Sequence, residues 1–409
     1  MPSTFDAFET PQRLAMVSAA VLTVAAGLTM AAGASDVARF IFSALAIAAL
    51  AAVVGQSIEQ VGDYLGPGAT GLLQSSLGNL PELFVAIFAL REGLTSVVQS
   101  ALVGSVLANL LLVLGVAFLS GGARYGIQRF RPEAPRMLVT LLTLAVGALL
   151  VPTLAVHLET PAAQHAGTLS DVTAVILFLV YAASIPFWLR GGPSGQQLQN
   201  AAVAGPPASS AGSQTTRPGP TRPGPGGVSA AGPAPNMTEP MVTSSTTPSE
   251  PPEAPRPWPL STAVVVLVIA GAASAFVSDW FVASLVPATR ALGITPEFTG
   301  LVIVAIASNA VENFAGVRFA WKARSDYAVS TILNSPLQIA LLLTPVLVLT
   351  SSFFGAHQLT LVFPPLLVAA LAVAIVVTAV VIYDGEYSWL EGVALIALYA
   401  IVAAAFWWG

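Results

Sequence analysis

The sequence predicts an all-α membrane protein with eleven transmembrane helices, on two observations. Of its 409 residues, 55% are hydrophobic and only 9% are charged, and the mean hydropathy is +0.80. Apolar runs also recur along the chain, each near the ~20 residues that a helix needs to cross the hydrocarbon core of a bilayer. Soluble domains do not combine these two features, so the lipid bilayer is the first expected partner.

The apolar runs fall into two groups, separated by one long polar segment. The expected spans cover residues 13–32, 37–58, 69–90, 96–119, 137–157 and 170–189, and then 261–286, 299–320, 327–350, 360–382 and 389–408. The segment between the groups, residues 191–258, is dominated by Pro, Gly, Ser, Thr and Ala. Such a composition cannot bury an apolar face, so a disordered linker is expected there.

The distribution of Lys and Arg predicts how the chain is oriented in the membrane. With eleven spans, 12 of the 15 Lys and Arg residues lie on the side of the N-terminus, and only Arg39, Arg91 and Arg290 lie on the other. Because Lys and Arg concentrate in cytoplasmic loops, the N-terminus and the linker are expected in the cytoplasm and the C-terminus outside, in a cytoplasmic membrane. The N-terminus lacks the basic region of a signal peptide, so the first apolar run is expected to remain as a span.

Several function classes have no support in the sequence. The chain contains no Cys, which excludes disulfides, iron–sulfur clusters and thiolate chemistry. No basic cluster suggests a nucleic-acid partner. No redox group, nucleotide-binding loop or nucleophile triad is visible, so neither an enzyme nor an ATP-driven pump is expected, and no cofactor.

Two acidic residues occur at matching points of a weak internal repeat. Residues 78–115 align with residues 308–345 without a gap. The alignment pairs the polar residues Asn79 with Asn309, Glu82 with Glu312, and Ser105 with Ser335. An ionised group at the centre of a membrane helix costs on the order of 2.5–3.5 kcal/mol, so such residues usually face a partner, a cavity or a bound ion. One site built between the two halves is therefore predicted.

The repeat also predicts the topology. Taking residues 37–190 and 259–409 as the two repeats gives five helices in each, an odd number, so the second repeat is inverted relative to the first. The helix within residues 1–36 is an addition outside this symmetry. Inverted repeats are typical of secondary transporters, whose substrate site lies near the midplane of the membrane.

The candidate ligands at the predicted site all offer oxygen. They are Glu82, Glu312, Asn79, Asn309, Gln99, Gln338, Ser105 and Ser335. A hard ion such as Ca2+ takes roughly six to eight oxygen ligands, carboxylates and amide carbonyls among them. When the ion leaves, two neighbouring carboxylates repel each other, which favours protonation of one of them. Competition between Ca2+ and H+ for the same carboxylates is sufficient for antiport.

Two helix breaks are expected beside these ligands. Gly78 and Pro81 flank Asn79 in the third span, where glycine permits unusual dihedral angles and proline removes a backbone donor. Pro336 is expected to break the ninth span, within residues 334–338, in the same way. Loosened backbone at membrane depth is tolerated where it lines a cavity, and its free carbonyl groups become candidate cation ligands.

The same stretches resemble the Ca2+/H+ antiporters of the cation/Ca2+ exchanger superfamily. The resemblance rests on Gly78-Asn79-Leu80-Pro81-Glu82, on the run from Gly104-Ser105 to Leu114-Gly115, and on Ser335-Pro336-Leu337-Gln338. It implies that Glu82 and Glu312 bind the exchanged cation and that the four amide residues complete or flank the site. It also implies that Glu59 and Asp279 line the access route.

The resemblance implies export of Ca2+ in exchange for H+ by alternating access, with a gate formed by the second and seventh spans. The chain departs from the family at Asn313, which replaces a usual His and cannot titrate. Exchange of Na+ or K+ for Ca2+ by the same fold is therefore an alternative, as is a passive cation channel with charged pore rings. Oxygen ligands alone do not separate Ca2+ from Mn2+ or other divalent ions.

Overall fold

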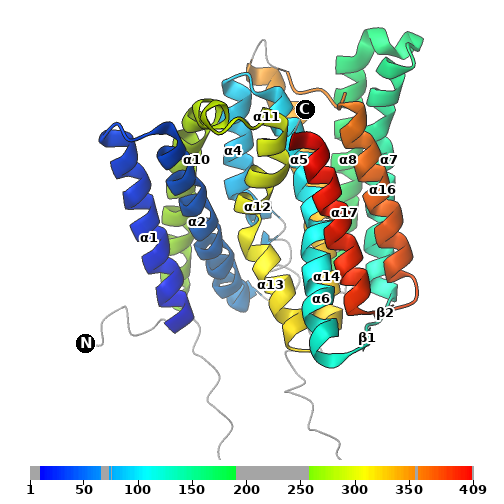
Figure 1. Ribbon diagram of the computed structural model, residues 1–409, viewed down its shortest axis with the longest axis horizontal. Coiled ribbons are helices and arrows are strands. Elements are labelled where there is room, and N and C mark those ends of the chain that lie inside the picture. The colour runs from blue at the N-terminus through cyan, green and yellow to red at the C-terminus, as the bar shows by residue number, and fades with distance from the viewer. Residues whose placement is uncertain (1–9, 66–72, 75, 190–257, 355–357, 408–409) are drawn as a thin grey trace, which may run out of the picture.

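The fold is almost entirely helical (Figure 1). The computed structural model describes residues 10–65, 73–74, 76–189, 258–354 and 358–407. Two short strands accompany the helices in these ranges, β1 (Gln128–Arg129) and β2 (Glu386–Tyr387), and they pair antiparallel. The predicted linker lies outside the described residues except for Trp258.

Nine helices in the described ranges are long and apolar enough to cross a membrane. In chain order they are α1 (Thr10–Ala31), α2 (Asp36–Leu65), α5–η2–α6 (Thr95–Leu107, Ala108–Val113, Leu114–Tyr125), α7 (Glu133–His157), η3–α8 (Pro161–His165, Ala166–Leu189), α10 (Leu260–Leu292), α14–η5–α15 (Ser325–Gln338, Ile339–Leu343, Thr344–Ser351), α16 (Pro365–Ile382) and α17 (Trp389–Trp407). A short 3-10 turn, η6 (Ser352–Phe354), follows α15. The prediction of an all-helical membrane fold is confirmed.

The two other predicted spans, the third and the eighth, contain interrupted helices. The third includes α4 (Leu80–Arg91), which begins after a turn at Gly78 and Asn79. The eighth consists of α11 (Pro296–Phe298), η4 (Thr299–Val304), α12 (Ala305–Ser308) and α13 (Ala310–Trp321), with the break at Asn309. The backbone angles at the two breaks are nearly the same, φ −91° and ψ 17° at Asn79 and φ −101° and ψ 13° at Asn309. Both lie in the bridge region, outside the α-helical region.

The helix break expected beside Pro81 is confirmed, and the break expected at Pro336 is wrong. α14 continues through Pro336 to Gln338, and η5 follows it with π-helical geometry. A membrane helix tolerates the missing N–H of proline where neighbouring helices and a local π adjustment satisfy the freed groups. The second break lies at Asn309 instead, where the side-chain Nδ2 donates to the Ala305 carbonyl at 3.0 Å and so satisfies an orphan carbonyl at the end of α12.

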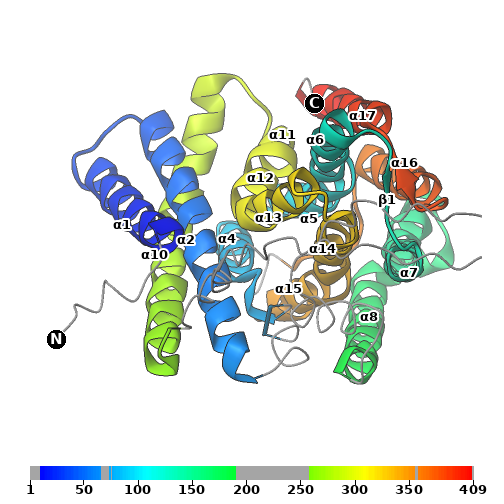
Figure 2. The same cartoon turned by 90° about the horizontal axis from the view of Figure 1, so that it is seen from below.

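Three helices, α1, α2 and α10, form a group at one edge of the molecule (Figures 1 and 2). α2 and α10 pack together along much of their length, and Phe40 stacks on Phe281 with ring centroids 4.9 Å apart. Trp258 is buried just before α10. Its backbone N–H donates to Gln60 of α2 at 2.8 Å, and its indole N–H donates to Gln12 of α1 at 2.9 Å. α1 is therefore fastened to the pair of helices that the sequence predicts as a gate.

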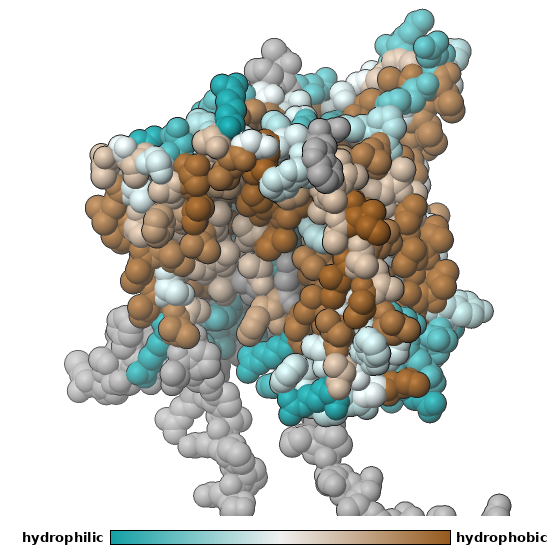
Figure 3. Space-filling view, viewed as in Figure 1, coloured by the Kyte–Doolittle hydropathy of each residue, from teal (hydrophilic) through white to brown (hydrophobic). Residues whose placement is uncertain are grey.

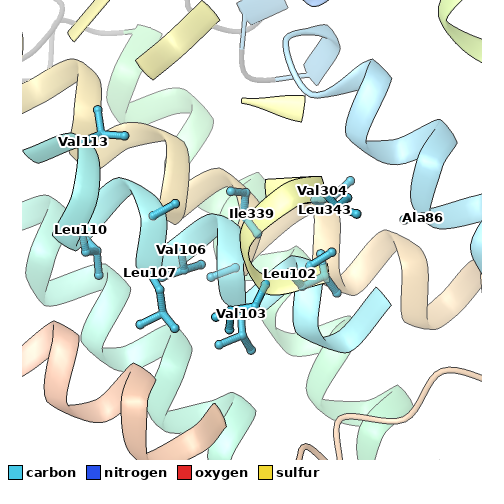
Figure 4. Close-up of a cluster of buried hydrophobic side chains, with 14 of the residues drawn as sticks. Ala86, Leu102, Val103, Val106, Leu107, Leu110, Val113, Val304, Ile339 and Leu343 are labelled. Carbon is cyan, nitrogen blue, oxygen red and sulfur yellow. The ribbon is translucent and has the colours of Figure 1, made fainter. Parts of the chain in front are cut away.

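The remaining helices pack around the central helix α5–η2–α6. Of its most apolar 18 residues, 83% are buried, against 11% in α1. Figure 4 shows part of this core, in which Leu102, Val106 and Leu107 lie among side chains that include Val304 of η4 and Ile339 of η5. The centre of the molecule is therefore closely packed and apolar, and a polar group placed there must find a partner inside the protein.

α5 and η4 cross in direct backbone contact because of two glycines. A Cβ on Gly104 would lie 2.3 Å from the carbonyl oxygen of Leu301, and a Cβ on Gly300 would lie 2.5 Å from that of Val97. Only glycine permits so close an approach. The contact holds η4, in the first half of the interrupted helix, against α5.

The surface matches a protein that lies in a bilayer. Figure 3 shows a broad hydrophobic band across the middle of the molecule, with hydrophilic residues at its upper and lower edges. α1 contributes to the exposed apolar surface with Leu14, Val17, Val21 and Leu28, each between 51% and 70% exposed. Exposed side chains of this kind suit contact with lipid tails.

The β1–β2 ribbon joins two connections, α6–α7 and α16–α17, at the lower edge of Figure 1. Tyr387 anchors it: the ring stacks on Phe118 with centroids 4.0 Å apart, and the hydroxyl lies 3.1 Å from Ser325 Oγ. Burial raises the pKa of Tyr387 above its usual value, so the hydroxyl stays neutral. The ribbon is thus tied to α6 and α14.

Candidate cation site

The two helix breaks place two glutamates in equivalent local positions. Glu82 is the third residue of α4 and Glu312 the third residue of α13, and each of these helices is 12 residues long. The N-terminus of a helix carries a partial positive charge, which favours a carboxylate in its first turn. Figure 1 shows α4 in the upper half of the molecule and α13 in the lower half. Both helices therefore begin near the centre.

Glu82 is buried at the centre of the molecule. It is 3% exposed, and among the described side chains it is the only buried carboxylate. Its Oε1 accepts a hydrogen bond from the Ser105 hydroxyl of α5. The Ser105 Oγ in turn accepts a hydrogen bond from Asn309 Nδ2 at 3.0 Å. A continuous chain of hydrogen bonds thus joins the break in the second half to the glutamate of the first half.

A second group of amides and hydroxyls lies beside this chain. Asn79 Nδ2 donates to Gln338 Oε1 at 3.4 Å, and Asn109 Nδ2 lies 3.4 Å from Ser335 Oγ. All four residues are buried, and each contact joins one half of the sequence to the other. The structure therefore brings together six of the eight predicted ligands: Asn79, Glu82, Ser105, Asn309, Ser335 and Gln338.

Asn109 is a candidate site residue that the sequence analysis did not single out. It is 1% exposed, and its Nδ2 donates to the Ser105 carbonyl at 2.9 Å. Its Oδ1 is buried and has no hydrogen-bond partner among the described residues. A buried amide oxygen without a donor is costly unless an ion or water completes it. The available signal was its spacing, because a residue four positions after Ser105 lies on the same helix face.

A small cavity adjoins Glu82 between α4, α5 and η4. Its volume is about 10 Å³, about the least that holds one water molecule. Apart from Glu82 its lining is apolar and includes Val85, Ala89, Val98 and Val304. The cavity extends from Glu82 toward the α4–α5 connection, and it has no room for a hydrated cation.

The arrangement can be compared with known proteins. Residues 35–189 and 262–408 match the family described as sodium/calcium exchanger protein. The chain belongs to this family. The match covers both halves and leaves out the whole predicted linker, so the membership expected from the sequence motifs is confirmed.

This exchanger is similar to proteins named for Ca2+ and H+ exchange. It is 36% identical over 371 residues to the Ca(2+)/H(+) antiporter of Synechocystis sp., covering 90% of each chain. It is 32% identical over 362 residues to the Ca(2+)/H(+) antiporter ChaA of Bacillus subtilis, covering 88% of this chain and 89% of that protein.

Solved structures show the same fold. The structure of native YfkE superposes with a TM-score of 0.73 at 26% identity, over 97% of this exchanger and 100% of that chain. The H+/Ca2+ exchanger CAX superposes with a TM-score of 0.65 at 16% identity, over 97% of this exchanger and 92% of that chain. The second similarity supports the fold alone.

Two predicted ligands of the exchanger are not placed at the site by described contacts. Gln99 Nε2 donates to the backbone carbonyls of Thr360 and Val362, at 3.0 and 2.9 Å, in the segment before α16. The side-chain amide of Gln99 therefore binds the backbone of the segment that precedes α16. The side chain of Glu312 lies outside the described part of the structure, so its role stays a prediction.

The predicted access residues lie on the α2–α10 pair. Glu59 is in α2 and Asp279 is in α10, and both side chains are exposed. Exposure is compatible with a place along an access route. No described contact ties either residue to the cation site, so this role stays a prediction as well.

The donor set suits a hard cation. Among the described residues no three His, Cys, Asp or Glu side chains come together, so carboxylates alone do not supply the ligands there. Amide and hydroxyl oxygens surround one buried carboxylate instead, and such oxygens are ligands for Ca2+. None of the described residues that make these contacts supplies sulfur or imidazole, which are the ligands that softer transition metals prefer.

Proposed function

We propose that this exchanger exports Ca2+ in exchange for H+. The observation that carries the proposal is the hydrogen-bond chain from Asn309 through Ser105 to the buried Glu82. It makes one site out of two distant parts of the sequence, as an alternating-access transporter needs. The names of the similar proteins from Synechocystis sp. and Bacillus subtilis support the same ion pair, Ca2+ and H+.

The chemistry of the exchange follows from the burial of Glu82. In a site of low dielectric constant a carboxylate needs a bound cation or a proton, because an isolated charge is strongly destabilised. Ca2+ and H+ are therefore mutually exclusive at Glu82. Departure of one ion to one side of the membrane leaves the site ready for the other ion from the opposite side. Glu312, in the equivalent position of α13, supplies the second carboxylate in this proposal.

We further propose eleven spans, made of one extra helix within residues 1–36 and two inverted five-helix repeats in residues 37–190 and 259–409. Two pairs of features support the repeat. The breaks at Asn79 and Asn309 share their backbone angles, and each is followed by a helix of 12 residues. π-Helical segments also occupy matching places in η2 and η5. The third and eighth spans are then the two interrupted ones.

In the proposed cycle, α2 and α10 move against the rest of the molecule, and α1 moves with them because of its ties to Trp258 and α2. Glu59 and Asp279 line the access route on this moving unit. The asymmetry of Lys and Arg supports a cytoplasmic N-terminus and linker and an external C-terminus.

The test is Ca2+ flux in sealed vesicles that contain the purified protein. A pH gradient alone should drive uphill Ca2+ accumulation, which a channel cannot sustain. A Na+ or K+ gradient without a pH gradient should drive none. Accumulation driven by Na+ or K+ instead would replace the proposal with the alternative coupling that Asn313 raises.

A further inference from the structure

Basic residues are concentrated in the connections at one end of the helix bundle, which lie at the lower edge of Figure 1. There α6 and α13 end, α7 and α14 begin, and the β1–β2 ribbon joins the α6–α7 and α16–α17 connections. Apart from Arg13 at the start of α1, the described basic residues at this end are Arg124, Arg129, Arg131, Arg136, Arg318, Lys322 and Arg324. The opposite end of the described bundle carries Arg39, Arg91 and Arg290.

Three of these cations have partners within the protein. Arg129 Nε lies 2.9 Å from Glu386 Oε1. Arg136 lies over the Tyr383 ring, 4.9 Å from its centroid, and Arg124 lies over the Trp321 ring at the same distance. Only the Arg129–Glu386 pair cancels a charge, because the neutral rings leave Arg124 and Arg136 positive.

Four other cations, which we call the basic rim, are exposed and make no ion pair within the described part of the chain. They are Arg131, Arg318, Lys322 and Arg324. Two nearby carboxylates accept backbone donors: Asp326 Oδ1 accepts the N–H of Arg131 at 2.6 Å, and Glu391 Oε2 accepts the N–H of Ser388 at 2.6 Å. Glu133 and Asp384 are exposed at the same end, and within the described residues neither forms an ion pair with a rim cation. The positive charge of the rim is thus available to a ligand.

Exposed aromatic and apolar side chains at the same end place the rim at the surface of the bilayer. Trp321 is 52% exposed, Tyr383 71%, Tyr125 43% and Ile127 68%. Trp and Tyr of this kind collect at the level of lipid headgroups. Figure 3 shows hydrophilic residues along the lower edge, directly below the hydrophobic band.

We propose that the basic rim binds the headgroup of an anionic phospholipid. Arg and Lys side chains pair with phosphate oxygens, and clusters of them next to a membrane helix attract anionic lipids. The lipid is favoured over a free phosphate because the exposed rings and Ile127 continue the surface into the hydrocarbon band, where acyl chains lie. Because α13 runs from Asn309 to the rim, the headgroup holds the far end of a helix that begins at the cation site.

The experiment uses the full chain, purified in detergent, and measures the apparent Kd for phosphatidylglycerol and for phosphatidylcholine with the same acyl chains. The test variant is Arg318→Gln/Lys322→Gln/Arg324→Gln. A matched control removes three cations from the opposite end, Arg39→Gln/Arg91→Gln/Arg290→Gln. Size-exclusion profiles and circular dichroism check that both variants fold, and Arg318→Lys/Arg324→Lys retains the charge as a further folding-neutral comparison.

We expect phosphatidylglycerol to bind to wild type, to the control and to the Lys variant alike, and about 100-fold more weakly to the rim variant. Phosphatidylcholine should bind all of them equally weakly. The proposal is overturned if the rim variant keeps its affinity, if both triple variants lose affinity equally, or if inorganic phosphate at equal ionic strength competes fully. Much tighter lipid binding after deletion of residues 200–250 would show that acidic residues of the linker, and not a lipid, occupy the basic rim in the full chain.

Discussion

Asn309 Nδ2 lies 3.0 Å from Ser105 Oγ, although the two residues are 204 positions apart in the chain. The Ser105 hydroxyl makes two hydrogen bonds at once. It accepts one from Asn309 and donates the other to the carboxylate of Glu82. The backbone contact of Gly104 with Leu301 holds the two helices close enough for this to happen. One serine therefore connects the interrupted helix of the second half to the buried acid of the first.

Replacing Glu82 with Gln should abolish Ca2+ exchange. The amide cannot balance the charge of Ca2+ and cannot take up a proton, and loss of one partner of a buried charge costs about 3–5 kcal/mol, which is at least about 100-fold in affinity. Proton-driven Ca2+ uptake in vesicles measures this. Glu92→Gln, at the exposed C-terminal end of the same helix, serves as the control and should transport normally. Retained uptake by Glu82→Gln would remove Glu82 from the site.

Replacing Ser105 with Ala should weaken Ca2+ affinity by between about 5-fold and 100-fold, because a buried charged group loses a hydrogen-bond donor. Ser100 supplies the control. It lies on the same helix and is fully buried, and its Oγ has no hydrogen-bond partner among the described residues. Ser100→Ala should be close to wild type in the concentration dependence of uptake. Equal effects of the two substitutions would show that Ser105 acts through packing alone.

Replacing Asn109 with Ala should lower Ca2+ affinity by roughly 5- to 10-fold. This fold-change corresponds to the net free energy of about one hydrogen bond or ligand contact. The reason is the loss of the buried Oδ1, which no described donor satisfies. Initial uptake rates over a range of Ca2+ concentrations separate a change in KM from a change in maximal rate. An unchanged KM would mean that the oxygen faces an internal water molecule and takes no part in cation binding.

Replacing Gln99 with Met should destabilise the protein by about 1–3 kcal/mol, because the carbonyls of Thr360 and Val362 lose their donor. The KM for Ca2+ should stay unchanged. Gln338→Met should give the opposite pattern, with a raised KM and a smaller drop in Tm, because that side chain contacts Asn79 at the site. A raised KM in Gln99→Met would restore Gln99 as a cation ligand.

Replacing Gly104 with Ala should reduce stability and exchange together. The added methyl group would overlap the Leu301 backbone at 2.3 Å and separate α5 from η4, and overpacking of this kind costs about 1–3 kcal/mol or more. Gly147→Ala is the control, since nothing lies within 4 Å of a Cβ there. The Tm of both variants is measured by thermal unfolding in detergent. A wild-type Tm for Gly104→Ala would show that α5 and η4 are not in close contact.

Features set by local sequence were predicted correctly. Hydropathy determined the all-helical membrane fold, because each span satisfies its own backbone hydrogen bonds and needs only an apolar run of sufficient length. The break beside Pro81 followed from the neighbouring Gly78, since the two residues act on the same turn. The buried position of Glu82 followed from the cost of a charge in an apolar segment.

Features that depend on what lies beside a helix were decided only by the tertiary structure. Pro336 does not break its helix, because surrounding helices and the π turn of η5 accommodate it, while Asn309 does break one without any proline. The amide of Gln99 binds the backbone of a segment some 260 residues away, and Asn109 presents a buried oxygen beside Ser105. Amide side chains both donate and accept, so their partners are set by the neighbours that packing provides and not by their own position in the chain.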